Sequence, residues 1–279
     1  MKVLVFSDPY WSLGRVHRGV EKQLPQHEFR YVDWNIQHTL IEYFMWCDKC
    51  ITNLHCSRFL KNSYPMLDLK KCIFVCHGAG EHSADPSTYD SQLQYGMTSD
   101  SVRNLFPPHI KDVFLMPNGV DEDDFIYKER DGIIRRMGWC GGEHVASKQL
   151  GWAKEISTTT GIPLDIASQL SYEEVAKWYH SVDILLVTAV PIPESETGPL
   201  PVFEAIVSGI PVIGTPVGNF RHIPGPKFTN IAEAVELIKF LQEFPEKVKA
   251  LAKVQYEYVI QNFTYKAMAH KWNNALEFS

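Results

Sequence analysis

The stretch ILLVTAVPIPESETGPLPVFEAIVSGIPVIGT, residues 184–215, decides the fold because it contains a complete strand–loop–helix–strand unit. The apolar run at 184–190 predicts a buried strand, and the polar loop after it leads into a short helix. Pro201 stands at the start of this helix, where its missing N–H is harmless. The run at 211–215 predicts the next strand. This order of elements is typical of a parallel sheet.

The same alternation continues on both sides of this unit, in two successive series. In the first series the predicted strands lie at 3–6, 29–34, 50–54, 72–76 and 113–117, with helices at 15–24 and 99–106. In the second series the strands lie at 133–139, 163–168, 184–190 and 211–215, with helices from 148, 171 and 201 and a helical C-terminal end. The acidic stretch 119–132 is the predicted linker. We therefore predict an α/β protein with two Rossmann-like, doubly wound parallel-sheet domains, at residues 1–125 and 126–262.

The helix that begins after Ser171 has the clearest signal, because Ser171 and Glu174 fit a capping box. The apolar residues that recur there at helical spacing are Val175, Trp178, Tyr179 and Val182. We expect its aromatic side chains to belong to the core and not to stack on a ligand.

Composition excludes several classes of protein. The chain has 279 residues, 45% of them hydrophobic, and a net charge of −6, which argues against binding nucleic acid by general phosphate neutralisation. The start, MKVLVF, lacks the features of a signal peptide, and no apolar run approaches the roughly 20 residues of a membrane span. We therefore expect a cytoplasmic protein with neither a nucleic-acid partner nor a transmembrane segment.

The six cysteines are expected to be reduced thiols in a chain of this size. A zinc site is the alternative for CDKCITNLHC, which contains Cys47, Cys50, His55 and Cys56. The run CITNL resembles a strand, whose successive side chains point to opposite faces, so these groups would not converge on one ion. We predict no metal site.

In open parallel sheets the ligand site lies at the carboxyl ends of the strands, and with two domains we expect it in the cleft between them. The loop before Pro201 is such a site: the N–H groups near Leu200 and Val202 and the helix dipole suit a phosphate. Glu204, an acceptor when ionised, suits vicinal hydroxyls such as those of a ribose. The alternative is that Glu204 only interacts with the helix dipole.

A second strand-to-helix loop, GWCGGEHVASKQLGW at 138–152, has Gly141 and Gly142 at a close turn of the backbone. Lys148 follows near the start of a helix, where the dipole disfavours a cation unless an anion lies between them. The alternative is a solvated lysine. Two such loops together favour a nucleoside diphosphate ligand.

At this point a family resemblance is visible. The segment 193–218 resembles the donor-binding signature of the retaining family-4 glycosyltransferases, in which two glutamates are separated by seven residues; here they are Glu196 and Glu204. The stretches YGMTSDSVRNLF, FLMPNGVDEDDF and GGEHVASK resemble three further motifs of that family, in the same order. The resemblance covers most of residues 72–220.

The resemblance implies the two-domain GT-B architecture and a retaining, metal-independent hexosyl transfer from a nucleotide-diphosphate sugar, with no other cofactor. Glu204 would bind the ribose, Glu196 would lie against the donor sugar, and Lys148 would hold the diphosphate. Backbone at Gly142, Gly198, Leu200 and Pro201 would approach the donor. The last helix, about 263–279, would pack back on the first domain.

On the acceptor side the resemblance points to His77, which follows a strand of the first domain, and to Gly14, left from a glycine loop. An imidazole at His77 can bond a sugar hydroxyl and help to stabilise an oxocarbenium-like transition state. The acceptor itself, a glycan, lipid or protein, is not identified. Because the first domain is short, its acceptor site is open or is completed by a second copy of the chain.

Three departures from the family accompany these expectations. Thr197 and Pro199 stand where glycines are usual, and Glu143 stands where an arginine would bind phosphate; Arg135, Arg136 or Arg221 could replace it. A nucleotide-sugar epimerase and a catalytically inactive nucleotide-sugar binding protein therefore stay open as alternatives. The acidic run 121–123 is linker and not a metal-binding Asp-x-Asp motif.

Overall fold

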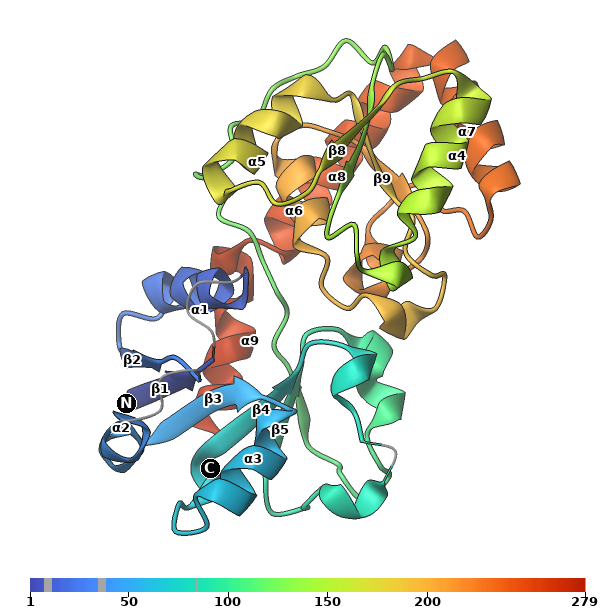
Figure 1. Ribbon diagram of the computed structural model, residues 1–279. Helices are drawn as coiled ribbons and strands as arrows, with labels where there is room; N and C mark the ends of the chain where they lie inside the picture. Colours follow the sequence, from blue (N-terminus) through green and yellow to red (C-terminus); the bar gives the residue numbers. More distant parts are fainter. Residues whose placement is uncertain (8–11, 35–38, 84, 279) are drawn as a thin grey trace. The chain divides into compact units, whose positions relative to one another are not determined.

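The computed structural model describes residues 1–7, 12–34, 39–83 and 85–278. The chain divides into two compact units, one of Met1–Gly119 and Tyr265–Ser279 and the other of Val120–Thr264 (Figure 1). The first boundary falls at the beginning of the acidic stretch 119–132, a few residues before the predicted position.

Unit 1 is built on a six-stranded parallel sheet in the order β2-β1-β3-β4-β5-β6. Its strands are β1 Lys2–Phe6, β2 Glu28–Val32, β3 Lys49–Asn53, β4 Cys72–Cys76, β5 Gln94–Met97 and β6 Val113–Leu115. The central strands are buried along almost their whole length, because helices cover both faces of the sheet. Such strands appear in the sequence as continuous apolar runs.

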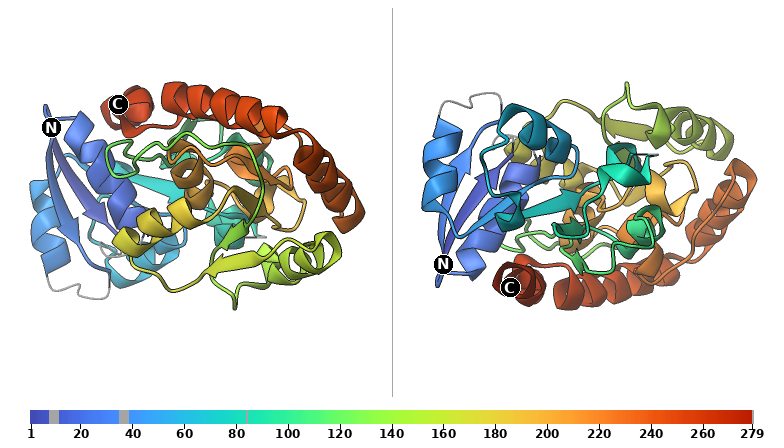
Figure 2. Two further views of the ribbon diagram at one scale, coloured as in Figure 1. Left: turned by 90° about the horizontal axis from the view of Figure 1, so that it is seen from above. Right: turned by 90° about the horizontal axis from the view of Figure 1, so that it is seen from below.

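The helices of unit 1 are α1 Ser12–Gln23, α2 Leu40–Trp46, α3 Cys56–Ser63 and α9 Tyr265–Glu277. The last of these comes from the far end of the chain and lies beside α1 (Figures 1 and 2). Gly19 of α1 leaves no room for a Cβ because the Tyr265 ring packs on it. The indole N–H of Trp272, a fully buried residue, donates to Pro117 O at 3.1 Å. Unit 1 therefore consists of two distant parts of the chain.

Unit 2 is built on a four-stranded parallel sheet in the order β10-β9-β7-β8. Its strands are β7 Met137–Cys140, β8 Leu164–Ala167, β9 Ile184–Val187 and β10 Val212–Gly214. Its helices are α4 Leu150–Thr160, α5 Tyr172–Trp178, α6 Leu200–Val207, α7 Ile231–Glu243 and α8 Pro245–Asn262. Helix α4 packs with α7, and α6 packs with α8. Both sheets are parallel and Rossmann-like, so the predicted fold class is confirmed.

Local sequence explains the best-predicted helices. At α5 both bonds of the capping box form: Glu174 N–H donates to Ser171 Oγ at 3.3 Å, and Ser171 N–H donates to Glu174 Oε2 at 2.8 Å. Helix α6 is apolar around most of its circumference and buried from Val202 to Val207. A helix of this kind belongs inside a domain.

No helix in the described part of the chain is long and apolar enough to cross a membrane.

His17 of α1 gives unit 1 a predicted pH dependence. The residue is buried, its Nδ1 lies 3.4 Å from Ser7 Oγ, and burial, with a smaller contribution from His77, lowers its pKa to about 3. Between pH 6.5 and pH 3, His17 is protonated in the unfolded chain but neutral in the folded protein. Acid therefore favours the unfolded chain, and the free energy of unfolding falls by about 1.4 kcal/mol per pH unit over this range. Urea unfolding of wild-type protein and His17→Gln at pH 7, 6 and 5 measures this difference. Parallel pH curves for the two proteins would contradict it.

Candidate functional site

The strand order of unit 2 defines where a ligand can bind. From β7 the chain crosses to β8 on one side, whereas β9 and β10 lie on the other, so the order reverses between β7 and β9. A crevice opens at the carboxyl ends of such strands. The loops that follow these two strands, at 141–149 and 188–199, are the two loops predicted from the sequence.

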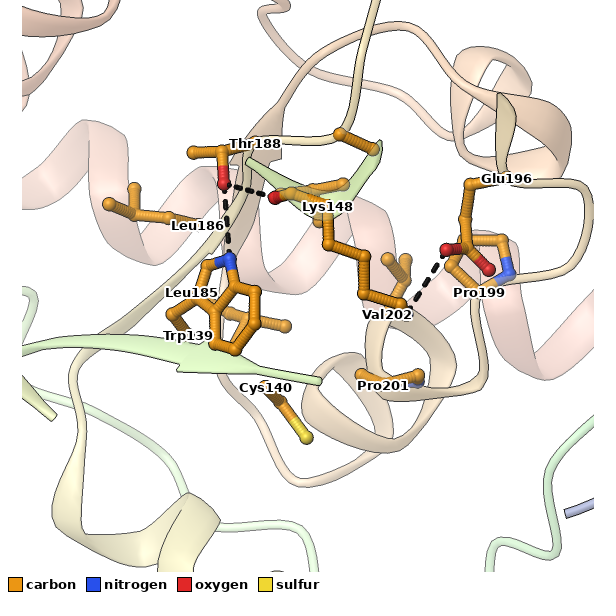
Figure 3. A pocket seen from close by; sticks show the side chains of 12 residues that line it. Trp139, Cys140, Lys148, Leu185, Leu186, Thr188, Glu196, Pro199, Pro201 and Val202 are labelled. Atoms are coloured by element: carbon orange, nitrogen blue, oxygen red, sulfur yellow. Dashed lines mark hydrogen bonds and ion pairs between the residues drawn. The ribbon is translucent and has the colours of Figure 1, made fainter. Parts of the chain in front are cut away.

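Lys148 and Glu196 point toward each other from these two loops (Figure 3). Lys148 Nζ lies 3.1 Å from Glu196 Oε2, and each side chain is about one quarter exposed (25% and 24%). Lys148 is therefore neither a solvated lysine nor part of α4; it ends a 3-10 turn, Ala146–Lys148, just before that helix. The structure brings together an ammonium and a carboxylate predicted for the same site.

The backbone of Lys148 is held by Thr188, the residue that follows β9. Thr188 Oγ1 donates to Lys148 O at 3.0 Å and accepts the indole N–H of Trp139 at 3.0 Å. A Cβ on Gly141 would lie 2.8 Å from Lys148 Cδ, so the glycine allows the lysine side chain to cross the loop. Next to it, a Cβ on Gly142 would approach His144 and Val145 to 3.1 Å. The two glycines allow the side chains of this loop to pack closely against its backbone.

The segment that carries Glu196 rests on the 3-10 turn Gly218–His222, which follows β10. Asn219 N–H donates to Thr197 O at 2.8 Å. Gly218 has a φ of +41°, and a Cβ there would collide with the carbonyl oxygens of Glu196 and Thr197. This contact fixes the backbone conformation of the loop that carries Glu196.

The cavity between the two loops is small in this conformation, about 30 Å³. Its lining includes Trp139, Cys140, Lys148, Thr188, Glu196, Pro199 and Pro201. Such a volume holds one or two water molecules. A nucleotide is much larger than this volume, so the cavity as it stands does not enclose one.

The first turn of α6 differs in part from the prediction. The helix begins at Leu200 with Pro201 as its second residue, but Val202 N–H donates to Pro199 O at 3.0 Å. The prediction that Val202 offers a free N–H to a phosphate is wrong, because the proline-rich turn uses it. Of the two predicted N–H groups, that of Leu200 remains a candidate for binding phosphate. It lies close to the buried Gly198.

Glu204 lies deeper in α6, outside the lining of this cavity and only 6% exposed. Its Oε2 accepts a hydrogen bond of 3.0 Å from the hydroxyl of Tyr179, which also lies 3.2 Å from Pro201 O. The Tyr179 hydroxyl therefore links Glu204 to Pro201, which does line the cavity. The sequence placed Tyr179 in the core, which is correct, but gave no sign that its hydroxyl meets Glu204.

The arginines suggested in place of Glu143 fall into two groups. Arg135 and Arg136 precede β7 and pair with Asp131 at 2.6 Å and Asp165 at 3.3 Å, at the amino ends of the strands. They are at the wrong edge to meet a phosphate beside Lys148. Arg221, in the turn after β10, is at the correct edge, and its Nε donates to His222 at 3.1 Å.

The two acceptor-side residues belong to unit 1. His77 directly follows β4; its backbone N–H donates to Glu81 Oε2 at 3.2 Å, and burial lowers its pKa below the usual value. Gly14 lies in the first turn of α1 and not in a loop, so its predicted local structure is wrong. The glycine-loop pattern is too short here to distinguish a loop from a helix start.

Unit 1 also contains a larger cavity, of about 820 Å³, between α3 and residues 81–95. Its lining includes the cations Arg58, Lys61 and Lys70, the carboxylates Asp68, Glu81 and Asp90, and the aromatic residues Tyr89 and Tyr95. Neither His77 nor Gly14 lines it.

Among the residues described, no group of three or more His, Cys, Asp or Glu side chains is arranged to hold a metal ion. Cys47, Cys50 and Cys56 are buried as free thiols. Cys50 lies opposite Cys72 on the neighbouring strand β4.

Two parallel Rossmann-like sheets, with a charged pair at the switch point of the second, are the architecture of the GT-B fold, and the family match identifies the class as glycosyltransferase. A family model described as glycosyl transferase-like matches residues 130–274, more than half of the chain. The chain belongs to this family. No curated protein sequence matches it significantly.

Solved structures show the same fold over the full length. The catalytic domain of starch synthase IV from Arabidopsis thaliana, bound to ADP and acarbose, matches 99% of this chain over 98% of its own, with a TM-score of 0.71 and 9% identity. AviGT4, a glycosyltransferase involved in avilamycin A biosynthesis, matches 99% over 97%, with a TM-score of 0.65 and 13% identity. The N-terminal domain of trehalose-6-phosphate phosphatase from Candida albicans has a TM-score of 0.63 and 11% identity, over 99% and 98%.

Proposed function

We propose that this protein transfers a glycosyl group from a nucleoside diphosphate sugar to an acceptor, with retention of configuration and without a metal ion at the diphosphate. The observation that carries the proposal is the Lys148–Glu196 pair at the switch point of unit 2, 3.1 Å apart. An ammonium group, a helix N-terminus and glycine backbone that a ligand can approach closely all favour phosphate groups. Together they suit a nucleoside diphosphate.

Each residue of unit 2 has a proposed role. Lys148 binds the diphosphate and stabilises the negative charge that grows on the leaving oxygen, in place of a cation. Glu196, once released from Lys148, lies against the donor sugar, and Glu204 accepts hydrogen bonds from the ribose hydroxyls. The backbone at Gly142 and from Gly198 to Pro201 approaches the phosphates. Arg221 is the arginine best placed to take the role that Glu143 cannot fill.

A thermal-shift panel of nucleoside diphosphates and nucleotide sugars tests this proposal. A ligand at about a hundred times its dissociation constant adds roughly 2.7 kcal/mol to the free energy of unfolding. The best binder is then offered as a donor with sugar, lipid and peptide acceptors. A panel with no stabilising nucleotide would overturn the proposal.

A nucleotide-sugar binding protein without transferase activity is the second candidate. It is favoured by Glu143, an exposed carboxylate in the loop where the family resemblance expects a phosphate-binding arginine. The two candidates differ in donor hydrolysis without acceptor: a transferase slowly releases nucleotide from the bound sugar donor, whereas a binding protein returns it intact.

Glu204→Ala is predicted to weaken the binding of the nucleoside diphosphate. Removing the carboxylate deprives the ribose of a charge-assisted acceptor, worth about 1.5–3 kcal/mol, or roughly 10-fold to 150-fold in affinity. Isothermal titration calorimetry measures the change. Unchanged affinity would limit Glu204 to a structural role within α6.

A further inference from the structure

We propose that the cavity of about 820 Å³ in unit 1 binds a sugar that carries carboxylate or phosphate groups. Arg58, Lys61 and Lys70, which line the cavity, bind the negative charge of this sugar. The inference goes beyond the proposed function, because the cavity belongs to unit 1 and its lining contains none of the residues assigned to the nucleotide.

The cavity exists because one crossover of the unit 1 sheet is not an α-helix. Parallel strands are usually joined by a helix that covers one face of the sheet. Helix α3 makes this connection between β3 and β4 (Figure 1). Between β4 and β5, the described residues contain the short 3-10 turns Ala79–Glu81 and Pro86–Thr88 in place of an α-helix. The space beside α3 that a second helix would fill is left as the cavity.

Three cations of the lining have no partner among the described residues. Arg58 and Lys61 lie three residues apart on α3, so they share one face of that helix, and Lys70 belongs to the 3-10 turn before β4. Within the described chain none of these side chains forms an ion pair or a hydrogen bond, and all three are exposed. An anion that enters the cavity therefore meets cations that hold no carboxylate.

The carboxylates of the lining, in contrast, are used within the protein. Each accepts a hydrogen bond from a backbone N–H: Asp68 from Lys70 at 3.2 Å, Glu81 from His77 at 3.2 Å and Asp90 from Gln92 at 2.9 Å. Asp85, a further carboxylate near Arg58, accepts the Ser87 N–H at 2.9 Å and does not line the cavity. The charged groups left to bind a ligand are therefore cations, which form strong hydrogen bonds with carboxylate and phosphate.

The rest of the lining suits a sugar better than a nucleobase or an acyl chain. Ser57 and Asn62 of α3 have no side-chain hydrogen bond within the described chain, and their hydroxyl and amide groups can pair with sugar hydroxyls. A base would need an exposed aromatic face to stack on, but Tyr89 and Tyr95 are only 7% and 1% exposed. An acyl chain would need an apolar lining, but most of the lining residues are polar.

Titration calorimetry at low salt tests the proposal with two anionic sugars, trigalacturonate and glucose 1,6-bisphosphate. Neutral maltotriose and inorganic phosphate are the controls. We expect at least one anionic sugar to bind wild-type protein about tenfold more tightly than either control, because only an anionic sugar meets both the cations and the hydroxyl-binding groups. Added salt should weaken this binding. Tighter binding of trigalacturonate indicates an acidic glycan, and tighter binding of the bisphosphate indicates a phosphorylated sugar.

Substitutions on α3 locate the bound sugar. Arg58→Gln and Lys61→Gln are each expected to weaken its binding by about threefold to tenfold, the effect of losing one partly exposed charge pair. Lys61→Arg keeps the charge and is expected to retain most of the affinity. Lys266→Gln, at an exposed position of α9 outside the lining, is the matched control and should bind as wild-type protein does. Thermal melting of each variant shows that it is folded at the temperature of titration.

The outcomes distinguish this inference from the proposed function. If neither anionic sugar binds more tightly than the controls, the inference is overturned and the nucleotide site of unit 2 is unaffected. Lys148→Ala is expected to keep the affinity for the anionic sugar. Binding that is lost in Lys148→Ala but kept in Arg58→Gln and Lys61→Gln belongs to the nucleotide site and also overturns the inference. Binding of the sugar without binding of any nucleotide supports the inference and overturns the proposed function alone.

Discussion

Replacing Lys148 by alanine is expected to weaken nucleoside diphosphate binding by roughly 10-fold to 150-fold, since it removes a charge-assisted bond to phosphate worth about 1.5–3 kcal/mol. Transfer should slow further, by about a hundredfold, because negative charge on the leaving oxygen grows in the transition state. Titration calorimetry measures the binding, and nucleotide release with a working donor measures the turnover. Lys154→Ala, an exposed lysine of the following helix, is the control that should change neither.

Replacing Glu196, the partner of Lys148 in the ion pair, is expected to change nucleotide affinity in the opposite direction. In Glu196→Gln the lysine no longer binds a carboxylate at 3.1 Å, and a negative charge near the phosphates is removed. Affinity for the bare nucleoside diphosphate should therefore rise severalfold, whereas turnover should fall because Glu196 is proposed to lie against the donor sugar. If Glu196→Gln weakened nucleotide binding as much as Lys148→Ala, the two residues would not compete in the way proposed.

Replacing His77 by alanine is expected to lower turnover by about a hundredfold or more while leaving nucleoside diphosphate affinity nearly unchanged. The proposed nucleotide-binding residues all belong to unit 2, whereas His77 follows β4 of unit 1. Burial lowers the pKa of His77, so a neutral imidazole is present at pH 7, and this is the form proposed to exchange hydrogen bonds with a sugar hydroxyl.

The measurement for His77 is the same pair of assays, with His270→Ala as control, because His270 is exposed on α9. Full turnover in His77→Ala would show that the family resemblance has been assigned to the wrong histidine. A loss of nucleotide affinity as large as in Lys148→Ala would show that the variant disturbs more than the transfer step.

The strands were predictable where both faces of a sheet are covered. VLVF, CIFVC and ILLV are continuous apolar runs for that reason, and each is a strand in the structure. Helix α2, LIEYFMW, was missed because only one of its seven residues is charged, so it shows no polar face with a helical period. The predicted helix at 99–106 is a 3-10 segment, Asp100–Leu105, since its few residues do not complete an amphipathic face.

The sequence was sufficient to locate the loops of the candidate site, but not the contacts between their side chains. Glycine and proline mark where the chain turns after a strand, so both loops of unit 2 could be located. The Lys148–Glu196 and Tyr179–Glu204 contacts join residues far apart in sequence, and they depend on the strand order β9-β7-β8, which places these segments next to each other. Nothing in a local pattern states that order. The use of the Val202 N–H by Pro199 O is, in contrast, a local contact within the proline-rich turn.

The return of α9 to unit 1 has a consequence for synthesis on the ribosome. The strands of unit 1 are translated before unit 2, but the helix that covers Gly19 and brings the indole of Trp272 to Pro117 is translated after it. Unit 2, residues 120–264, is therefore the first part of the molecule that can complete its contacts, although domains are more often completed from the N-terminus. Until residues 265–277 leave the exit tunnel, one side of the first sheet stays open to chaperones and to other nascent chains. A stop codon shortly before α9 would thus leave the second unit able to fold and the first exposed to degradation.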